Sequence, residues 1–165
     1  TTDAAALSDG GKLLTVIYMF IGGSPGSTAG GIKTTTVAVL LLYTLAEMRH
    51  SRSAAIFGRR IDPEYHRRAA VIAANNLGLA LGASLLLCLL QPAVPLADCL
   101  VETFSAIGTV GMSTGITRQL GALSRALLIF LMYCGRVGSL SFSLALFEKR
   151  SRPPVTQPTE TLIIG

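Results

Sequence analysis

Charged side chains are scarce in this sequence. They make up 14% of its 165 residues, while hydrophobic residues make up 50% and the mean hydropathy is +0.57. An average soluble domain has about 25% charged residues. The composition therefore excludes an ordinary soluble domain and predicts an integral membrane protein.

Cysteine and histidine are also few. Cys88, Cys99 and Cys134 lack C-x-x-C spacing, so we interpret them as small apolar residues rather than as a metal or redox site. His50 and His66 lie in one basic segment and form no metal-binding constellation. No combination of nucleophile, base and acid is evident, so the sequence predicts neither an enzyme nor a bound cofactor.

Two long stretches are almost free of charge. Residues 69–91 contain no charged side chain, and residues 126–147 are interrupted only by Arg136. About 20 apolar residues in a helix cross a hydrocarbon core of about 30 Å, so we expect two membrane spans. Residues 13–45 are also mostly apolar, but a glycine-rich segment divides them into halves that are each too short to span as a helix.

Basic residues cluster beside these spans. Six of the 14 lysines and arginines lie between Glu47 and Ala69, and three more follow Phe147. The positive-inside rule therefore predicts that residues 48–68 and the C-terminal residues 148–165 are cytoplasmic. The first cluster contains few aromatic residues and adjoins membrane segments, so we expect it to set the topology rather than to bind nucleic acid.

With both basic segments on one side, the chain between the spans must enter and leave on the outer face. This segment, residues 97–117, reads ADCLVETFSAIGTVGMSTGIT. Its acids, hydroxyl groups and glycines are poorly suited to lipid contact. We therefore expect a re-entrant hairpin buried in protein rather than a third span.

The hairpin begins with the pattern of a short helix. Residues 98–107 have one apolar face, and Gly108 is expected to end the helix. Its C-terminal carbonyls carry about half a negative charge, which favours a nearby cation. The next residues are expected to present backbone carbonyls to cations, with glycine allowing the peptide planes to turn: Thr109, Val110, Gly111 and Met112. Tight helix packing is the alternative explanation for the small residues.

The segment SPGSTAGGIKTTT, residues 24–36, misses the phosphate-binding loop motif by one position. Gly26 and Gly31 are spaced as in G-x-x-x-x-G-K-[ST], but Ile32 separates Gly31 from Lys33. Glycine and proline let a chain leave helical geometry, which a membrane tolerates only where protein or pore water satisfies the backbone. The segment is therefore predicted to be a break in a membrane helix, and a simple packing kink is the alternative.

Arg136 is unusual because it lies within an apolar span. An arginine at the centre of a bilayer costs roughly 2.5–3.5 kcal/mol, so its side chain should face protein. Acids are few at that depth, and a guanidinium can instead donate to the exposed carbonyls of a broken helix. Arg136 then either holds the loop and repels cations, or has a purely structural role.

Three stretches together resemble a known family. FIGGSPGSTAGGIKTTT, SAIGTVGMSTGIT and MYCGRVGSLSF, in this order and spacing, are similar to the membrane subunit of the Trk, Ktr and HKT superfamily of potassium transporters, most of all its bacterial Ktr branch. The strip TVGMS resembles the potassium filter TVGYG, with Met112 and Ser113 in place of tyrosine and the second glycine. We therefore expect this segment to be looser than a potassium-channel filter and less selective for K+ by itself.

The resemblance implies an all-α integral membrane fold, in which helix, pore loop, helix repeats surround one pore. Residues 1–47 would be a broken helix ending the third repeat, 48–68 a cytoplasmic loop, 69–147 the fourth repeat and 148–165 a cytoplasmic tail. Because the chain begins with Thr1 and lacks the other filters, we read it as the C-terminal portion of a longer protein. The resemblance also implies a gate loop below the filter, with Arg136 as its partner: Gly22, Gly23, Ser24, Pro25, Gly26, Ser27, Thr28, Ala29, Gly30, Gly31 and Lys33.

The function implied by the resemblance is potassium uptake across the cell membrane. K+ would be the transported ion, and sodium dependence or Na+ permeation is a property of the family. The implied partners are the lipid bilayer, the other repeats of the same chain, a second copy in a homodimer, and a cytoplasmic ring of nucleotide-binding RCK subunits. Two other readings stay open: a two-span subunit that assembles four copies into a cation channel, and a non-conducting membrane protein in which Gly111 is dispensable.

Overall fold

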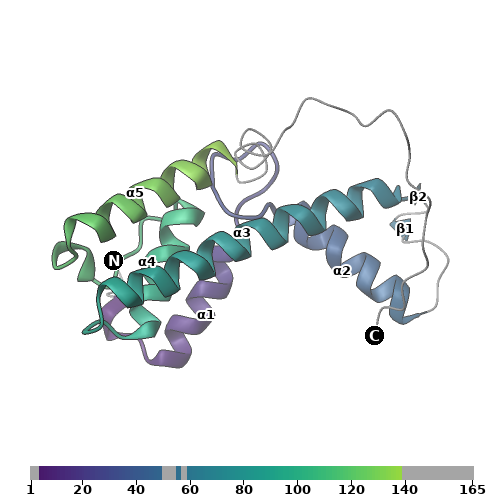
Figure 1. Cartoon of the computed structure of the whole chain (residues 1–165). Helices are drawn as coiled ribbons and strands as arrows, with labels where there is room; N and C mark the ends of the chain where they lie inside the picture. Colours follow the sequence, from purple (N-terminus) through teal and green to yellow (C-terminus); the bar gives the residue numbers. More distant parts are fainter. Residues whose placement is uncertain (1–3, 50–54, 57–58, 139–165) are drawn as a thin grey trace, which may run out of the picture.

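The computed structural model describes residues 4–49, 55–56 and 59–138 of the chain. Its described elements are, in order, η1 (Ala4–Ala6), α1 (Asp9–Phe20), α2 (Thr34–Met48), β1 (Ala55–Ile56), β2 (Arg59–Arg60), α3 (Pro63–Leu90), α4 (Leu96–Gly108), η2 (Ile116–Arg118) and α5 (Ala122–Val137) (Figure 1). The fold is all-α, as expected, apart from the antiparallel pair of two-residue strands between α2 and α3.

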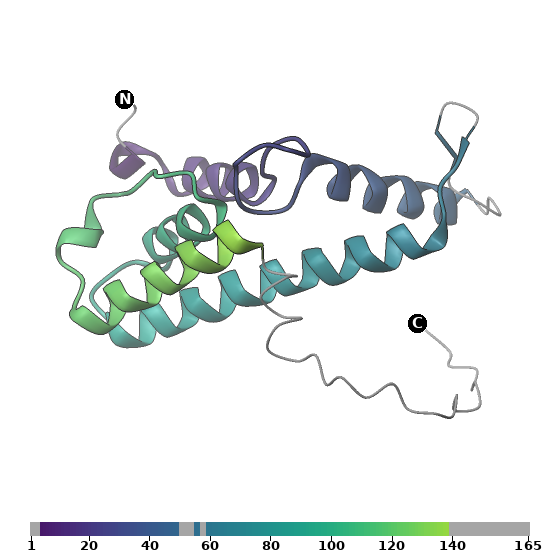
Figure 2. The ribbon, with the colours of Figure 1, turned by 90° about the horizontal axis from the view of Figure 1, so that it is seen from above.

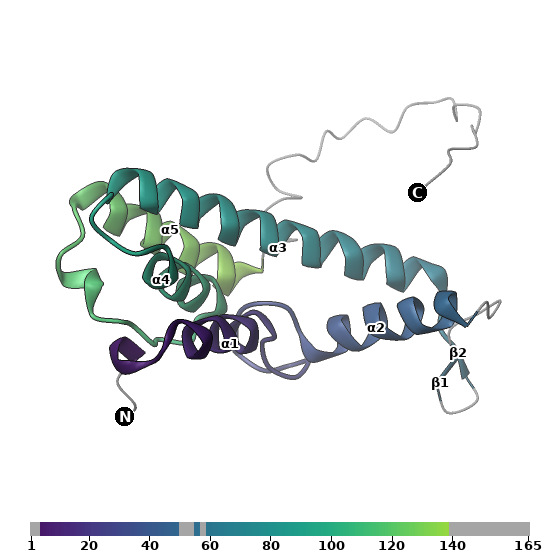
Figure 3. The same ribbon diagram turned by 90° about the horizontal axis from the view of Figure 1, so that it is seen from below.

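Helix α3 extends along the whole structure and supports the other helices. Helix α2 packs against it near the strands, whereas α4 and α5 pack against its other half (Figures 2 and 3). Helix α1 lies on the side of α4 away from α5, so α4 contacts α1, α3 and α5. Every residue of α4 from Val101 to Gly108 is buried. This short helix is therefore the centre of the fold, because the surrounding helices bury all of its residues from Val101 to Gly108.

Local signals explain why α3 forms. Asp62 caps its N-terminus by accepting a hydrogen bond from the Glu64 N–H at 2.9 Å, and Pro63 occupies the first turn, where no N–H is needed. Among the described residues, α3 is the one helix that is long and apolar enough to cross a membrane. Leu87 is fully buried while Leu89 is 77% exposed, so the helix has an apolar outer face as well as a core face. Such a helix suits a lipid environment.

The second expected span is described only in its first part. Helix α5 starts after Gly121 and has Gly138 at its C-cap, while residues 139–147 of the expected span lie outside the described residues. Arg136 therefore lies in the last described turn of α5.

Three boundaries differ from the sequence-based expectations. Residues 34–36, which were included in the expected break of the membrane helix, form the first turn of α2. Pro63 to Arg68, placed in the cytoplasmic loop, begin α3. Gly108 is the last residue of α4, and the left-handed residue that follows it is Thr109, with φ 52°. Glycine is needed at position 108 because α1 packs closely against it: a Cβ there would lie 2.9 Å from the Met19 carbonyl oxygen.

Helices α4 and α5 approach closely where glycine removes the side chain. A Cβ built on Gly135 would overlap the carbonyl oxygen of Ile107. This contact is between backbone groups, so no side-chain rotation can relieve the overlap. The two helices can therefore keep their distance only with glycine at this position.

We expect Gly135→Ala to lower the free energy of unfolding by about 1–3 kcal/mol, because the added methyl group forces α5 away from α4. Gly10→Ala is the matched control, since a Cβ at the exposed Gly10 meets no atom within 4 Å. Thermal unfolding of the detergent-solubilised protein measures both variants. Equal melting temperatures for the two would contradict the close contact.

Candidate functional site

Residues 21–33 form a loop between α1 and α2 (Figure 2). Backbone hydrogen bonds close it at its base: Gly22 N to Ile32 O at 2.7 Å, Ile32 N to Phe20 O at 3.2 Å, and Thr34 N to Gly23 O at 3.2 Å. The two ends of the loop thus bond to each other and to the unpaired backbone groups of Phe20 at the end of α1 and Thr34 at the start of α2, which lipid could not do.

Two cationic side chains hold the middle of this loop. Lys33 Nζ donates to the carbonyl oxygens of Ser27 at 2.9 Å and Ala29 at 2.6 Å. The guanidinium Nη1 of Arg136 donates to the carbonyl oxygen of Thr28 at 2.5 Å. Three successive carbonyls that could attract a free cation are therefore occupied by protein cations.

The loop also rests against the hairpin formed by α4 and the residues after it. The Gly30 N–H donates to Thr109 Oγ1 at 2.9 Å, and the Gly31 N–H donates to the Ile107 carbonyl oxygen at 3.2 Å. A Cβ at Gly30 would lie 2.7 Å from that oxygen. The structure thus brings Gly30 of the predicted loop into direct contact with Thr109, the first residue of the segment that was expected to present carbonyls.

We call Thr109, Val110, Gly111 and Met112 the strip. The sign of φ alternates along it, because Thr109 (52°) and Gly111 (83°) are positive while the other two are not. In a regular strand successive carbonyls point to opposite sides, and alternating left- and right-handed residues turn backbone groups of one kind toward the same side. The strip therefore departs from the geometry of a regular strand.

Thr109 is strained in this conformation. A β-branched residue in the left-handed region is a genuine outlier, and the region costs an L-residue roughly 1–2 kcal/mol. Its hydroxyl group accepts the hydrogen bond from Gly30. A glycine would remove the strain but would leave the Gly30 N–H without this acceptor, so the side chain is what links strip and loop.

The carbonyls at the end of α4 already accept hydrogen bonds from the protein. Those of Ser105, Ala106 and Ile107 accept hydrogen bonds from the N–H groups of Val110, Thr109 and Gly31, respectively. The chain turns back directly after the helix, so its own backbone reaches these oxygens first.

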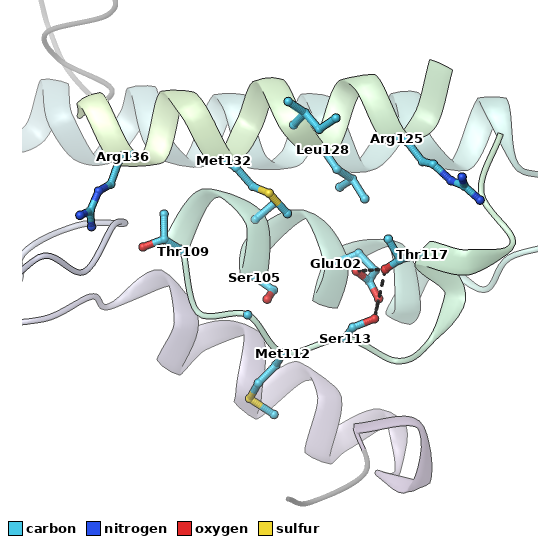
Figure 4. Close-up of a pocket in the computed structure, with 13 residues that line it drawn as sticks. Glu102, Ser105, Thr109, Met112, Ser113, Thr117, Arg125, Leu128, Met132 and Arg136 are labelled. Carbon is cyan, nitrogen blue, oxygen red and sulfur yellow. Dashed lines mark hydrogen bonds between the residues drawn. The ribbon is translucent and has the colours of Figure 1, made fainter. Parts of the chain in front are cut away.

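Glu102 is the residue that the sequence analysis missed. It is 5% exposed and accepts hydrogen bonds from Ser113 Oγ at 2.5 Å, Thr114 N at 3.0 Å and Thr117 Oγ1 at 3.0 Å (Figure 4). The sequence signal was an acid within an apolar helix followed by hydroxyl residues. It was read only as unsuited to lipid, because nothing in the spacing shows that the segment folds back beside Glu102.

A cavity of about 620 Å³ lies between this hairpin and α5. Glu102 and Thr117 are near one end of it, Arg136 and Thr109 are near the other, and Leu128 and Met132 of α5 form an apolar wall between them (Figure 4). Met112 points away from α5 and packs against the apolar cluster that includes Val16 and Met19 of α1. The strip therefore has an open side and a packed side.

An ion pair joins the start of α1 to the start of α4. Lys12 Nζ lies 2.7 Å from Asp98 Oδ1, with side chains that are 12% and 14% exposed. The two residues are 86 positions apart in the sequence. The pair holds the broken helix beside the hairpin at the end opposite to the loop.

Comparison with known proteins gives a consistent result. Residues 1–152 match the TrkH family model, described as a cation transport protein. The chain is 36% identical over 99% of its length to the potassium/sodium uptake protein NtpJ of Enterococcus hirae, and 34% identical over 100% to the Ktr system potassium uptake protein D of Bacillus subtilis. It is 31% identical over 99% to the Ktr system potassium uptake protein B of the same organism. The chain spans 37%, 36% and 36% of the lengths of these three relatives.

The link between strip and loop can be tested through Thr109. Thr109→Val keeps the side-chain shape but deprives the Gly30 N–H of its acceptor, which should lower the free energy of unfolding by about 1–3 kcal/mol. Thr109→Ser keeps the hydroxyl group and removes the β-branch, so its stability should equal or exceed that of the parent. Chemical denaturation in detergent compares the two, and a Val variant as stable as the Ser variant would show that the hydrogen bond is unimportant.

Proposed function

Because the chain belongs to the TrkH family of cation transport proteins, we propose that it supplies one ion-binding strip and an intramembrane gate to a potassium uptake protein. The family consists of transporters rather than enzymes, and its members lie in the membrane. The named relatives are potassium or potassium/sodium uptake proteins, and the chain covers just over a third of each of them. Other parts of the complete protein would supply the rest of the pore.

The contact between the loop and the strip carries this proposal. A segment that can block a path lies directly at the end of a row of backbone carbonyls, joined to it by the hydrogen bond from Gly30 to Thr109. Carbonyl rows that replace the hydration shell are the usual means by which proteins bind K+ in a membrane. A loop placed only to kink a helix would have no need of this contact.

The path of the chain supports a re-entrant pore loop. Gln91, which caps the end of α3, lies beside the start of α5, with its Nε2 3.5 Å from Ser124 Oγ. Helix α4 and the strip lie between these two points in the sequence, so the chain goes inward and returns to the same end (Figure 3). Helices α3 and α5 then flank a hairpin, which is the helix, pore loop, helix order that we propose for residues 69–147.

The orientation and the partners form part of the proposal. We assign residues 48–68 and the C-terminal residues to the cytoplasm because of their positive charge. The strands and the start of α3 lie at the end of the structure far from η2 (Figure 1), which leaves this basic end accessible to a cytoplasmic regulatory ring of the RCK type. A homodimer in the cell membrane is the assembly that we propose for the complete protein, with K+ as its substrate and Na+ as the competing or co-transported ion.

The strip is tested by Gly111→Ser in the complete protein. The Cβ would meet no atom within 4 Å, so the effect is conformational, because an L-residue with φ near 83° is strained. The strip should relax and its preference for K+ over Na+ should fall by about tenfold, which corresponds to roughly 1.4 kcal/mol. K+ and Na+ uptake into cells deficient in potassium uptake measures it, with Gly10→Ser as the control. Unchanged selectivity at normal expression would rule out the strip as an ion site.

The gate is tested by removing the two cations that hold the loop. Arg136→Ala and Lys33→Met each free carbonyls of the segment 27–29, so the loop should leave the path more often and K+ uptake per transporter should rise. The double variant should gain less than the sum of the two, because residues in one network couple by about 0.5–3 kcal/mol.

The exposed Arg68, which pairs with Glu64 on α3, provides the control Arg68→Ala and should leave uptake unchanged. Uptake is divided by the amount of transporter in the membrane. The gating role is wrong if both loop variants reach the membrane normally and carry less K+ than the parent.

A further inference from the structure

Glu102 is a buried carboxylate whose two oxygens are both used by the segment that follows the strip. Oε1 accepts from Ser113 Oγ and from the Thr114 N–H, and Oε2 accepts from Thr117 Oγ1 (Figure 4). A carboxylate with 5% exposure would be costly without such donors. All three donors lie within five positions of one another, immediately beyond Met112.

Helix α4 makes Glu102 a fixed point. The helix is enclosed by α1, α3 and α5, and its residues on either side of Glu102 are buried. Thr103, the next residue, is fully buried and its hydroxyl group lies 2.5 Å from that of Ser84 on α3. The segment 113–117 thus bonds to a helix that is itself held by its neighbours.

The other end of the strip is fixed separately. The Val110 N–H donates to the Ser105 carbonyl at 3.0 Å, and Thr109 accepts from Gly30 at 2.9 Å. The residues between these contacts and Ser113 are Gly111 and Met112. A short stretch of backbone is therefore held at both ends by the same helix, with Glu102 holding the end away from the loop.

We propose that Glu102 is a positioning residue that sets ion selectivity by fixing the spacing of the strip carbonyls. The inference rests on the proposed function of the strip as a cation site. Na+ is smaller than K+, so carbonyls spaced for K+ must move inward to coordinate Na+ equally well. The hydrogen bonds to Glu102 resist this movement, because contraction of the strip would have to stretch or break them.

The test uses Glu102→Gln in the complete transporter. The amide keeps the shape of the side chain but replaces one acceptor oxygen by a donor, so at least one of the three hydrogen bonds is weakened. The ratio of K+ to Na+ uptake should fall about three- to tenfold, because a weakened hydrogen bond holds the strip less firmly. Glu64→Gln is the matched control, because that carboxylate is 52% exposed on α3 and should leave the ratio unchanged.

Single-donor variants keep the test decisive if Glu102→Gln fails to reach the membrane. Thr117→Val removes the donor to Oε2 and the 3.2 Å contact with the Ser113 hydroxyl group, and Ser113→Ala removes one donor to Oε1 and the acceptor of the Gly115 N–H. Each should lower the ratio in the same direction. Thr117→Val combined with Glu102→Gln should change it by less than the sum of the two, because the residues share one network.

The outcomes separate this inference from the proposal on which it rests. If Gly111→Ser lowers the ratio while the Glu102 and Thr117 variants leave it unchanged at normal membrane levels, the strip is an ion site but Glu102 does not position it. If Gly111→Ser itself has no effect, the strip assignment fails. If the Glu102 and Thr117 variants lose only thermal stability and membrane level, with the ratio intact, Glu102 is purely structural and the inference is overturned.

Discussion

The carbonyl oxygen of Ile107 is the point on which the rest of the structure depends. It accepts a hydrogen bond from the Gly31 N–H, and neither Gly30 nor Gly135 could carry a Cβ beside it. The end of α4, the loop and α5 thus meet through backbone alone. A side chain at Gly30 would push the loop away from the strip, and one at Gly135 would push α5 away from α4, so both contacts depend on the absence of side chains at one place.

Backbone groups that leave a helix inside a membrane need partners, and this requirement explains most of the loop. The N–H and carbonyl groups at its base pair with each other, and Lys33 and Arg136 take up the carbonyls of residues 27–29. Lipid offers no alternative donors. The two cations therefore have a structural task in the closed loop, and the same contacts place positive charge beside the proposed ion path.

The sequence predicts the parts of this arrangement that depend on composition and length. The uncharged stretch of α3, the break between α1 and α2, and an arginine that must bond to carbonyls can all be inferred from the residue pattern. The left-handed Thr109 and the buried Glu102 cannot, because each depends on which segments meet after the chain folds back. Gly108 was expected to end the helix, because glycine is frequent in left-handed turns. Glycine is also frequent where two backbones approach closely, and only the folded structure shows that Gly108 packs against Met19.

The two ends of the strip differ in whether the loop contributes to the contacts that hold them. The Glu102 contacts lie within the α4 hairpin, so a movement of the loop leaves them in place. The end at Thr109 is also bonded to α4, through the Val110 N–H and the Ser105 carbonyl, but the Thr109 side chain bonds in addition to Gly30, which belongs to the loop itself. In the proposed gate, opening of the loop would break the hydrogen bonds to Thr109 and Ile107, at about 0.5–1.5 kcal/mol each, and would let the strained Thr109 relax. By reciprocity, a cation that bound the proposed site more tightly with Thr109 in its strained form would also stabilise the closed position of the proposed gate.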